Sequence, residues 1–538
     1  MYHPFLALAS FSLLPLFFGG VFATEPLPSG PSEICAGHSP VSNRQKSDKD
    51  NQRQNLAFNI FNVDSADQFE ELVESEKLTA GDTIVWADGT YSDVELDIKD
   101  HNGTKEQPIN FRAASPGGVI FSGESQLSIG AQHWVISGFH FKGDGETPNA
   151  YNAVQFRGNG GQPAQHARLT DCAFTNLSPD EGSSKWVLIF GQNNSIDHCH
   201  FSGKNSKGAL ITVELGYLKN EDTAGHQIFR NYFGNVAPQE GTDNETIRVG
   251  ASPDQNKRAQ CSIRENFFFG CDGEPEIISN KSSYNVYLRN TFRKCNGSLV
   301  LRHGHHATVE GNFFFGDGAE DAGGVRVSDS HHSIVNNYFQ DLTGTTWNSA
   351  FSILGGKAPS GGTSNGYQTV ENIVVMHNSI LNCHRSILLN KAKGSRAPAG
   401  TFANNLIVSS HEPLVTADLS PANMVWKGNL MFGAPIGADL EAITEDPGLA
   451  EADGLLRPNE TGPVANAATA LETAVTTDID GQTRQESGAD IGADEVSGAT
   501  GEIASAPLKP SDVGVSFLSG EEMEQDAPSE GGVKVEPK

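Results

Sequence analysis

A polar residue, most often asparagine, followed two positions later by a large apolar residue, recurs along the chain from about residue 130. It appears in segments such as RNYFGN, RENFFFG, RNTFRKC, EGNFFFG and KGNLMFG, and successive repeats are mostly 22 to 35 residues apart. The apolar positions are Phe141, Phe174, Phe201, Phe233, Phe268, Phe292, Phe314, Phe339, Ile380, Ile407 and Met431. Periods of this length are typical of solenoids, in which each repeat forms one coil of a stack.

The repeats consist of short β-branched and aromatic segments separated by glycine, asparagine and aspartate. Such segments favour strands, so the repeat predicts an all-β parallel β-helix rather than a leucine-rich or helical solenoid. Each coil is expected to place its phenylalanine in a stacked interior ladder and its asparagine at the adjoining bend. We assign these phenylalanines to the core and give them no chemical role.

One short helix is predicted ahead of the repeats. Ser65 and Gln68 have the spacing of a capping box, and Phe69, Leu72 and Val73 lie on one helical face. We expect this helix to cap the first coil. The sequence that follows the helix alternates as strands do, and the Asp-Gly pair at residues 88–89 predicts a turn.

The N-terminal residues have the pattern of a secretory signal peptide. Residues 5–23 are an apolar run that ends in a small-x-small motif, so residues 1–23 are predicted to be the signal and residues 24–55 a polar arm. An uncleaved membrane anchor is the alternative, because the segment before the run has no Lys or Arg, although Pro15 disfavours a spanning helix. We expect a secreted or periplasmic protein without stable membrane association after cleavage.

The solenoid is expected to span residues 56–497 as one domain. Residues 478–495, DIDGQTRQESGADIGADE, have the composition of a terminal coil. Residues 498–538 are rich in Pro, Glu and Ser and are predicted to form a disordered acidic tail.

The formal net charge of −29 excludes nucleic acid as a partner, because phosphate binding needs a basic surface. An anionic substrate would need a local basic or metal-lined groove. The seven cysteines have no zinc-site spacing. Cys172 and Cys199 lie one coil apart, where they form either a bridge or two buried thiols, and we favour the thiols.

Acidic and basic residues are grouped in the stretch 271–306. Lys281, Arg302 and Arg326 lie nine, ten and eleven residues before a repeat asparagine. Because adjacent coils stack about 4.8 Å apart, they are predicted to form a column of cations on one sheet face, which is costly without an anion. Three solvated basic residues on an outer face are the alternative.

Carboxylates accompany this column. Glu274 and Glu276 precede Lys281, and one coil earlier the chain reads Asp243-Asn244-Glu245. Carboxylate and carboxamide oxygens are the ligands that a hard cation such as Ca²⁺ takes. A carboxylate cluster neutralised by the neighbouring cations is the alternative.

These residues resemble the chondroitinase B and alginate lyase family of polysaccharide lyases, family six. The matching motifs are NETIRVG and E-x-E-x₄-K followed by RHG, here Glu274, Glu276, Lys281 and Arg302-His303-Gly304. The resemblance covers roughly residues 55–495 in architecture and implies a single-stranded right-handed parallel β-helix.

The resemblance also implies roles for individual residues. It implies Lys281 as the base, Arg302 as the acid, and Asn244, Glu274 and Glu276 as Ca²⁺ ligands. We place His303, Arg326 and Glu245 in contact with the sugar chain.

The function expected from this resemblance is calcium-assisted β-elimination in a uronate-containing polysaccharide. We expect alginate as the substrate, in a lyase of the poly(β-D-mannuronate) type that acts as a monomer. A chondroitin or dermatan sulfate lyase of the same family, a glycoside hydrolase and a non-catalytic binder of acidic glycans are the alternatives. Ultraviolet absorbance separates them, because only a lyase produces unsaturated uronate ends.

Overall fold

A computed structural model describes residues 58–144, 147–179, 182–219, 222–357, 359, 366–471, 475–485, 487–500 and 503–518. The predicted signal peptide and polar arm lie outside these residues. In the described part of the chain, no helix is long and apolar enough to span a membrane.

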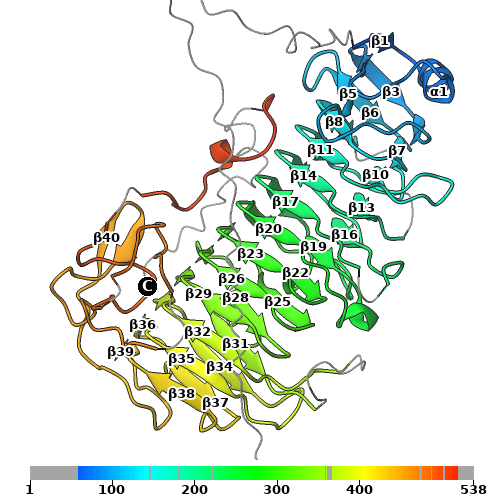
Figure 1. The fold of residues 1–538 in the computed structure, drawn as a ribbon. Helices are drawn as coiled ribbons and strands as arrows, with labels where there is room; N and C mark the ends of the chain where they lie inside the picture. The colour runs from blue at the N-terminus through cyan, green and yellow to red at the C-terminus, as the bar shows by residue number, and fades with distance from the viewer. Residues whose placement is uncertain are drawn as a thin grey trace, which may run out of the picture. The chain divides into compact units, whose positions relative to one another are not determined.

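Three parallel sheets make up the fold, and each coil contributes one strand to each sheet (Figure 1). Sheet A contains β1 (Ile60–Val63), β2 (Thr83–Trp86), β5 (Ile109–Ala113), β8 (Trp134–Ser137), β11 (Arg168–Thr170), β14 (Ser195–Asp197), β17 (Gln227–Phe229), β20 (Ser262–Arg264), β23 (Val286–Leu288), β26 (Thr308–Glu310), β29 (Ser333–Val335), β32 (Ile373–Met376), β35 (Gly400–Ala403) and β38 (Met424–Lys427). Sheet B contains β3 (Gly89–Ser92), β6 (Val119–Ser122), β9 (Phe139–Lys142), β12 (Ala173–Thr175), β15 (His200–Ser202), β18 (Tyr232–Val236), β21 (Phe267–Cys271), β24 (Thr291–Arg293), β27 (Phe313–Phe315), β30 (Tyr338–Gln340), β33 (Ser379–Leu381), β36 (Leu406–Ser409) and β39 (Leu430–Gly433). Sheet C contains β4 (Glu95–Ile98), β7 (Gln126–Ile129), β10 (Val154–Gln155), β13 (Val187–Ile189), β16 (Ile211–Val213), β19 (Ile247–Val249), β22 (Glu276–Lys281), β25 (Gly297–His303), β28 (Ala322–Val327), β31 (Phe351–Leu354), β34 (Ile387–Asn390) and β37 (Val415–Ala417).

The predicted phenylalanine ladder is confirmed. From Phe141 to Phe339 the eight ladder rings stack from coil to coil, with centroids 4.5 to 5.1 Å apart and planes within 14° of each other. The strand register continues the ladder through Ile380, Ile407 and Met431. The prediction of an all-β parallel β-helix is therefore correct.

The repeat asparagines form a second buried ladder, at the bend between sheets A and B. Its members are Asn231, Asn266, Asn290, Asn312, Asn337, Asn378, Asn405 and Asn429, and each side chain except that of Asn429 donates to the asparagine oxygen one coil further on, at 2.9 to 3.0 Å. Each also donates to a backbone carbonyl, as Asn290 does to Ile263 at 2.9 Å. The amides thus satisfy backbone groups that the bend leaves without a ladder partner.

The predicted helix is α1 (Ala66–Glu74), and it buries Phe69, Leu72 and Val73. The Ser65 side chain accepts from the Gln68 backbone amide, and the Gln68 side chain accepts from the backbone of Asp64. The cap therefore closes one residue earlier than the capping-box pattern predicts.

Residues after β39 differ from the prediction of a terminal coil. They include the antiparallel pair β40 (Ala450–Ala452) and β41 (Leu455–Arg457), and Ile479, Ile491 and Ala493 pack against residues of sheet B such as Phe313. Because Phe314 points into the core, Phe313 points outward. Residues 478–495 therefore cover the outer face of sheet B instead of closing the solenoid.

The predicted disordered tail is also different where the structure describes it. Residues 503–518 include a 3₁₀ turn at Pro510–Asp512 and pack Val513 against Tyr232 and Phe267 on the outer face of sheet B. The Gly514 amide donates to the Arg230 carbonyl at 2.9 Å. Apolar residues within an otherwise polar stretch hold this segment in place.

The six described cysteines, at positions 172, 199, 261, 271, 295 and 383, are buried free thiols, as we predicted for Cys172 and Cys199. Burial raises the pKa of the Cys172 thiol well above its usual range. These cysteines therefore behave as small apolar core residues.

The asparagine ladder generates a stability prediction. Asn290→Ala removes the partners of the Ile263 carbonyl and the Asn266 amide, so it should lower the free energy of unfolding by about 2–4 kcal/mol. Asn205→Ala, at an exposed asparagine, is the matched control and should change little. Urea and thermal unfolding measure both, and equal stabilities would refute the role of the ladder.

Candidate functional site

The longest strands of sheet C lie next to each other. β22, β25 and β28 have six, seven and six residues, and their pairing shifts register at Glu276–Ile278, Asn280–Lys281 and Gly297–Leu299. Such bulges bend a strand and redirect its side chains. The outer face of sheet C therefore changes shape where the predicted site residues lie.

Lys281 lies at the end of β22 and is only 14% exposed. Its Nζ donates to the Glu245 Oε1 at 2.9 Å and lies 4.0 Å from Asp243. The lysine is therefore held by two carboxylates from the preceding coil.

Arg302 and Arg326 converge on Glu276. Arg326 forms an ion pair with the Glu276 carboxylate, and the Arg302 Nε lies 3.7 Å from it. In register, Arg326 pairs with Val300, two residues before Arg302. The predicted single column is thus wrong in detail, because Arg326 is displaced along its strand and reaches back across β25 to the glutamate.

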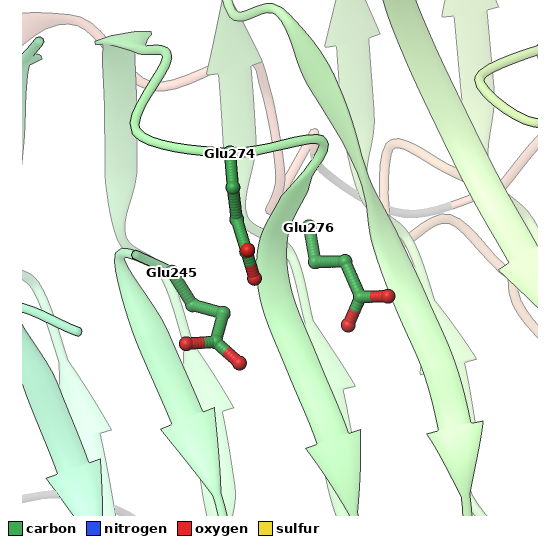
Figure 2. A group of neighbouring side chains, drawn as sticks. All are labelled: Glu245, Glu274 and Glu276. Atoms are coloured by element: carbon green, nitrogen blue, oxygen red, sulfur yellow. The ribbon is translucent and has the colours of Figure 1, made fainter. Parts of the chain in front are cut away.

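Three carboxylates form a compact group. Oxygens of Glu245, Glu274 and Glu276 all lie within 4.8 Å of one another. Figure 2 shows Glu274 and Glu276 on either side of the start of one strand, with Glu245 reaching in from the neighbouring one. Burial, with the charges of Glu245 and Glu276, raises the pKa of Glu274 to about 8.

The donor set of this carboxylate group fits a hard cation. The Glu245 Oε2 is buried and has no hydrogen-bond partner among the described residues. The pKa of Glu274 is raised by burial and by the two neighbouring carboxylates, although Lys281 and a backbone hydrogen bond from Asn244 oppose this. Both Glu276 oxygens already have partners, including Ser279 at 2.5 Å. A cation would therefore find free oxygens chiefly on Glu245 and Glu274.

Asn244, which we predicted as a ligand, directly precedes Glu245 in the chain. Its side-chain oxygen accepts from the Gly208 amide at 3.1 Å. Glu245, which we predicted to contact the sugar chain, lies in the three-carboxylate group. The ligand role of Asn244 and the sugar contact of Glu245 stay predictions.

The family assignment follows from the sequence as a whole. The family model described as chondroitinase B matches residues 63–455. The chain belongs to the chondroitinase B family. The predicted resemblance to family six of the polysaccharide lyases is confirmed.

Solved structures agree with this assignment. The family 6 alginate lyase AlyGC is 29% identical with a TM-score of 0.73, over 86% of this chain and 59% of that one, so this chain spans less than two thirds of AlyGC. A mannuronic acid specific family 6 lyase from human gut microbiota is 28% identical with a TM-score of 0.61, over 70% of this chain and 87% of that one. A family 6 lyase from Pseudopedobacter saltans is 25% identical with a TM-score of 0.60, over 70% of this chain and 94% of that one. No curated protein matches the chain.

Two aromatic residues beside the site were missed at the level of sequence. The Tyr367 ring lies 4.0 Å from the Arg302 guanidinium, and the Trp347 ring lies 5.8 Å from that of Arg326. Lys393 lies over both rings, at 4.5 Å from Trp347 and 5.1 Å from Tyr367. In the sequence, both residues lie in segments rich in Gly, Ser and Thr and outside the motifs that indicated the other site residues. An aromatic residue in such a segment was the only sequence feature that could have identified them.

The three histidines after Arg302 separate into two environments. His303 is fully buried beside Arg302, with its Nε2 3.2 Å from the Arg302 Nη1. His305 and His306 lie at the following turn, where His306 stacks between Tyr284 and His331. Only His303 joins the site, and the other two are part of a surface stack.

The raised pKa of Glu274 predicts a pH-dependent effect of Glu274→Gln on stability. Between the ordinary value of 4.5 and about 8, the carboxyl stays protonated in the folded state and ionises in the unfolded one. Wild type therefore loses stability across this window as pH rises. In excess chelator, the gain in melting temperature from Glu274→Gln should be small at pH 5, increase up to about pH 8 and then level off. Glu320→Gln, at an exposed glutamate, is the control; a gain that does not vary with pH would contradict the assignment.

Proposed function

We propose that this protein is an exported lyase that cleaves a uronate polysaccharide, with alginate as its substrate, by calcium-assisted β-elimination. The apolar run at residues 5–23 supports export. The chain's membership of the family supports the reaction type.

One observation carries the proposal: Lys281 and Arg302 lie on adjacent strands of sheet C, beside a group of three buried or half-buried carboxylates. β-Elimination needs a base for the proton on the carbon next to the uronate carboxylate and a donor for the leaving oxygen. A double bond forms in the sugar ring as the glycosidic carbon–oxygen bond breaks.

Lys281 is the proposed base. Its Nζ is the only lysine nitrogen that the described residues place against the carboxylate group, and Glu245 fixes its direction. Once neutral, the amine accepts the carbon-bound proton, and the shared electron pair moves into the new double bond.

Arg302 is the proposed acid. Its positively charged guanidinium stabilises the leaving oxygen. It passes a proton to that oxygen, directly or through water, and regains a proton from solvent. His303 and Glu276 hold the guanidinium from two sides. Arg326, paired with the same glutamate, stands where it can contact the sugar chain.

Glu274, Glu276 and Glu245, with Asn244 beside them, are the residues that would hold calcium. When bound, calcium places positive charge next to the uronate carboxylate, where negative charge increases during proton removal. The Glu245 oxygen without a hydrogen-bond partner and the crowding of negative charge around Glu274 support this assignment.

The substrate is proposed to be alginate rich in mannuronate. AlyGC is named as an alginate lyase, and the relative from gut microbiota is named as mannuronic acid specific. Because the matching family model is named for chondroitinase B, chondroitin and dermatan sulfates are the second candidate substrates. Incubation with each polymer, followed by ultraviolet absorbance, identifies the substrate.

Lys281→Ala and Arg302→Ala should each reduce turnover at least about 1,000-fold while the fold is kept, because each removes a group that acts in the transition state. Both side chains lie on the outer face of sheet C, at 14% and 23% exposure, so neither leaves a closed cavity. Lys142→Ala and Arg289→Ala, at exposed positions away from sheet C, are the controls. Full activity of either site variant with a native circular dichroism spectrum would remove the mechanism.

Calcium removal should suppress turnover, and added calcium should restore it. Glu276→Ala should mimic chelation, since it removes one of the three carboxylates and the partner of both arginines. The measurement is the initial rate in chelator and after calcium is restored. Unchanged rates in excess chelator would count against a calcium ion that exchanges with solution.

A further inference from the structure

Two consecutive residues, Tyr367 and Gln368, contact Arg302 and His303 although they lie about 65 residues further along the chain. They follow the Gly-rich segment after β31. The Lys357 amide donates to the Tyr367 carbonyl at 3.0 Å and closes the base of this segment. A Cβ at Gly356 would collide with the Gln368 backbone, so the two sides of the base are in direct contact. The position of Gln368 is therefore fixed by the backbone and not by its side chain alone.

Two hydrogen bonds of the His303 ring, one with Arg302 and one with Gln368, determine its tautomer. A guanidinium has only N–H donors, so the His303 Nε2, at 3.2 Å from the Arg302 Nη1, must accept. The Nδ1 of the neutral ring then carries the proton and donates to the Gln368 Oε1 at 3.3 Å. A reversed Gln368 amide would set two donors against each other, so the bonding pattern is consistent in only one direction.

His303 is held in its neutral form. Burial, with the positive charge of Arg302, lowers the pKa of His303 to about 4. The other charged groups acting on the ring are Lys281, which lowers its pKa, and Glu276, which raises it. The Tyr367 ring lies 6.2 Å from the imidazole. Neutral His303 therefore keeps an acceptor directed at Arg302 at neutral pH.

Tyr367 fixes the remaining side of the guanidinium. Its ring lies 4.0 Å from the Arg302 Cζ, close enough for cation–π attraction. The ring, the imidazole and the Glu276 carboxylate together leave Arg302 little freedom to turn. Of these contacts, only the imidazole depends on a second residue for its hydrogen-bonding direction.

We propose that Gln368 is a positioning residue for the acid: it fixes the Nδ1–H tautomer of His303, so that the Nε2 accepts from Arg302 and orients the guanidinium. The inference rests on the proposed function, because it assumes that Arg302 acts on the leaving oxygen. Gln368 itself contacts no reacting atom in this assignment. It lies outside the sequence motifs that identify the family.

Gln368→Leu tests the proposal by removing the acceptor. It should lower kcat about 10–100-fold, the range found when a partner that orients a functional histidine is lost, with KM changed less than about twofold. Gln340→Leu, at a glutamine of sheet B that bonds Tyr338, is the matched control and should leave kcat unchanged. A Gln368→Leu enzyme with wild-type kcat would overturn the inference.

Gln368→Glu separates tautomer control from a packing role. A carboxylate still accepts from Nδ1–H, but it also favours the doubly protonated ring, in which Nε2 cannot accept from Arg302. The ratio of its kcat to that of wild type at the same pH should approach one at pH 9 and fall as pH decreases toward 6. The corresponding ratio for Gln368→Leu should not vary with pH, because both enzymes share the titration of the base. Profiles of equal shape in the two variants would refute tautomer control.

A double-mutant cycle with His303→Ala completes the test. If Gln368 acts through His303, the loss in the double variant should not exceed that of His303→Ala alone. Additive losses would overturn the inference even if both single variants are impaired. Wild-type protein without lyase activity on any uronate polymer would instead reject the proposed function, and the inference with it.

Discussion

The structure depends on keeping each coil at one strand spacing from the next, and the buried asparagine ladder enforces that spacing at the bend between sheets A and B. Each ladder amide is bonded to a neighbouring ladder asparagine and to a backbone carbonyl, so a shift of one coil would leave several buried polar groups without partners. The phenylalanine ladder alone could not impose this, because stacked apolar rings tolerate sliding. The asparagines therefore provide the register, and the phenylalanines provide most of the buried apolar area.

A fixed register on one side of the coil allows irregularity on another. Sheet C has the longest strands and the bulges, and its outer face carries Lys281, Arg302 and the carboxylate group. Residues more than 30 positions apart in sequence, such as Glu245 and Lys281, meet because they occupy adjacent coils. The loops between strands vary in length without disturbing the ladders, so they can bring residues such as Tyr367 over the site at no cost to the core.

The sequence was informative where the interaction repeats and less so where it does not. The ladder positions, the helix around Phe69 and the clustering of Lys281, Arg302 and Glu276 follow from periodicity and motif spacing. Three features do not: the displacement of Arg326, which depends on a bulge; the place of Glu245 in the carboxylate group, where it also bonds Lys281; and the folding of residues 478–495 onto sheet B. Each results from a local contact that occurs once and therefore leaves no periodic pattern in the sequence.

The net charge of the whole chain disfavours binding of an anion, whereas the cations of the site favour it. Which effect dominates depends on the distance between the charges and the anion. A net charge of −29 repels a polyanion at long range, but at physiological salt that repulsion is screened beyond about 8 Å. Within that distance, Lys281, Arg302 and Arg326 alternate with the carboxylates that hold them. These pairs are only partly exposed, so screening weakens them less than it weakens the surface charges. The proposed recognition of an acidic sugar therefore depends on a few adjacent pairs, and a strongly acidic protein can present a site suited to an anion.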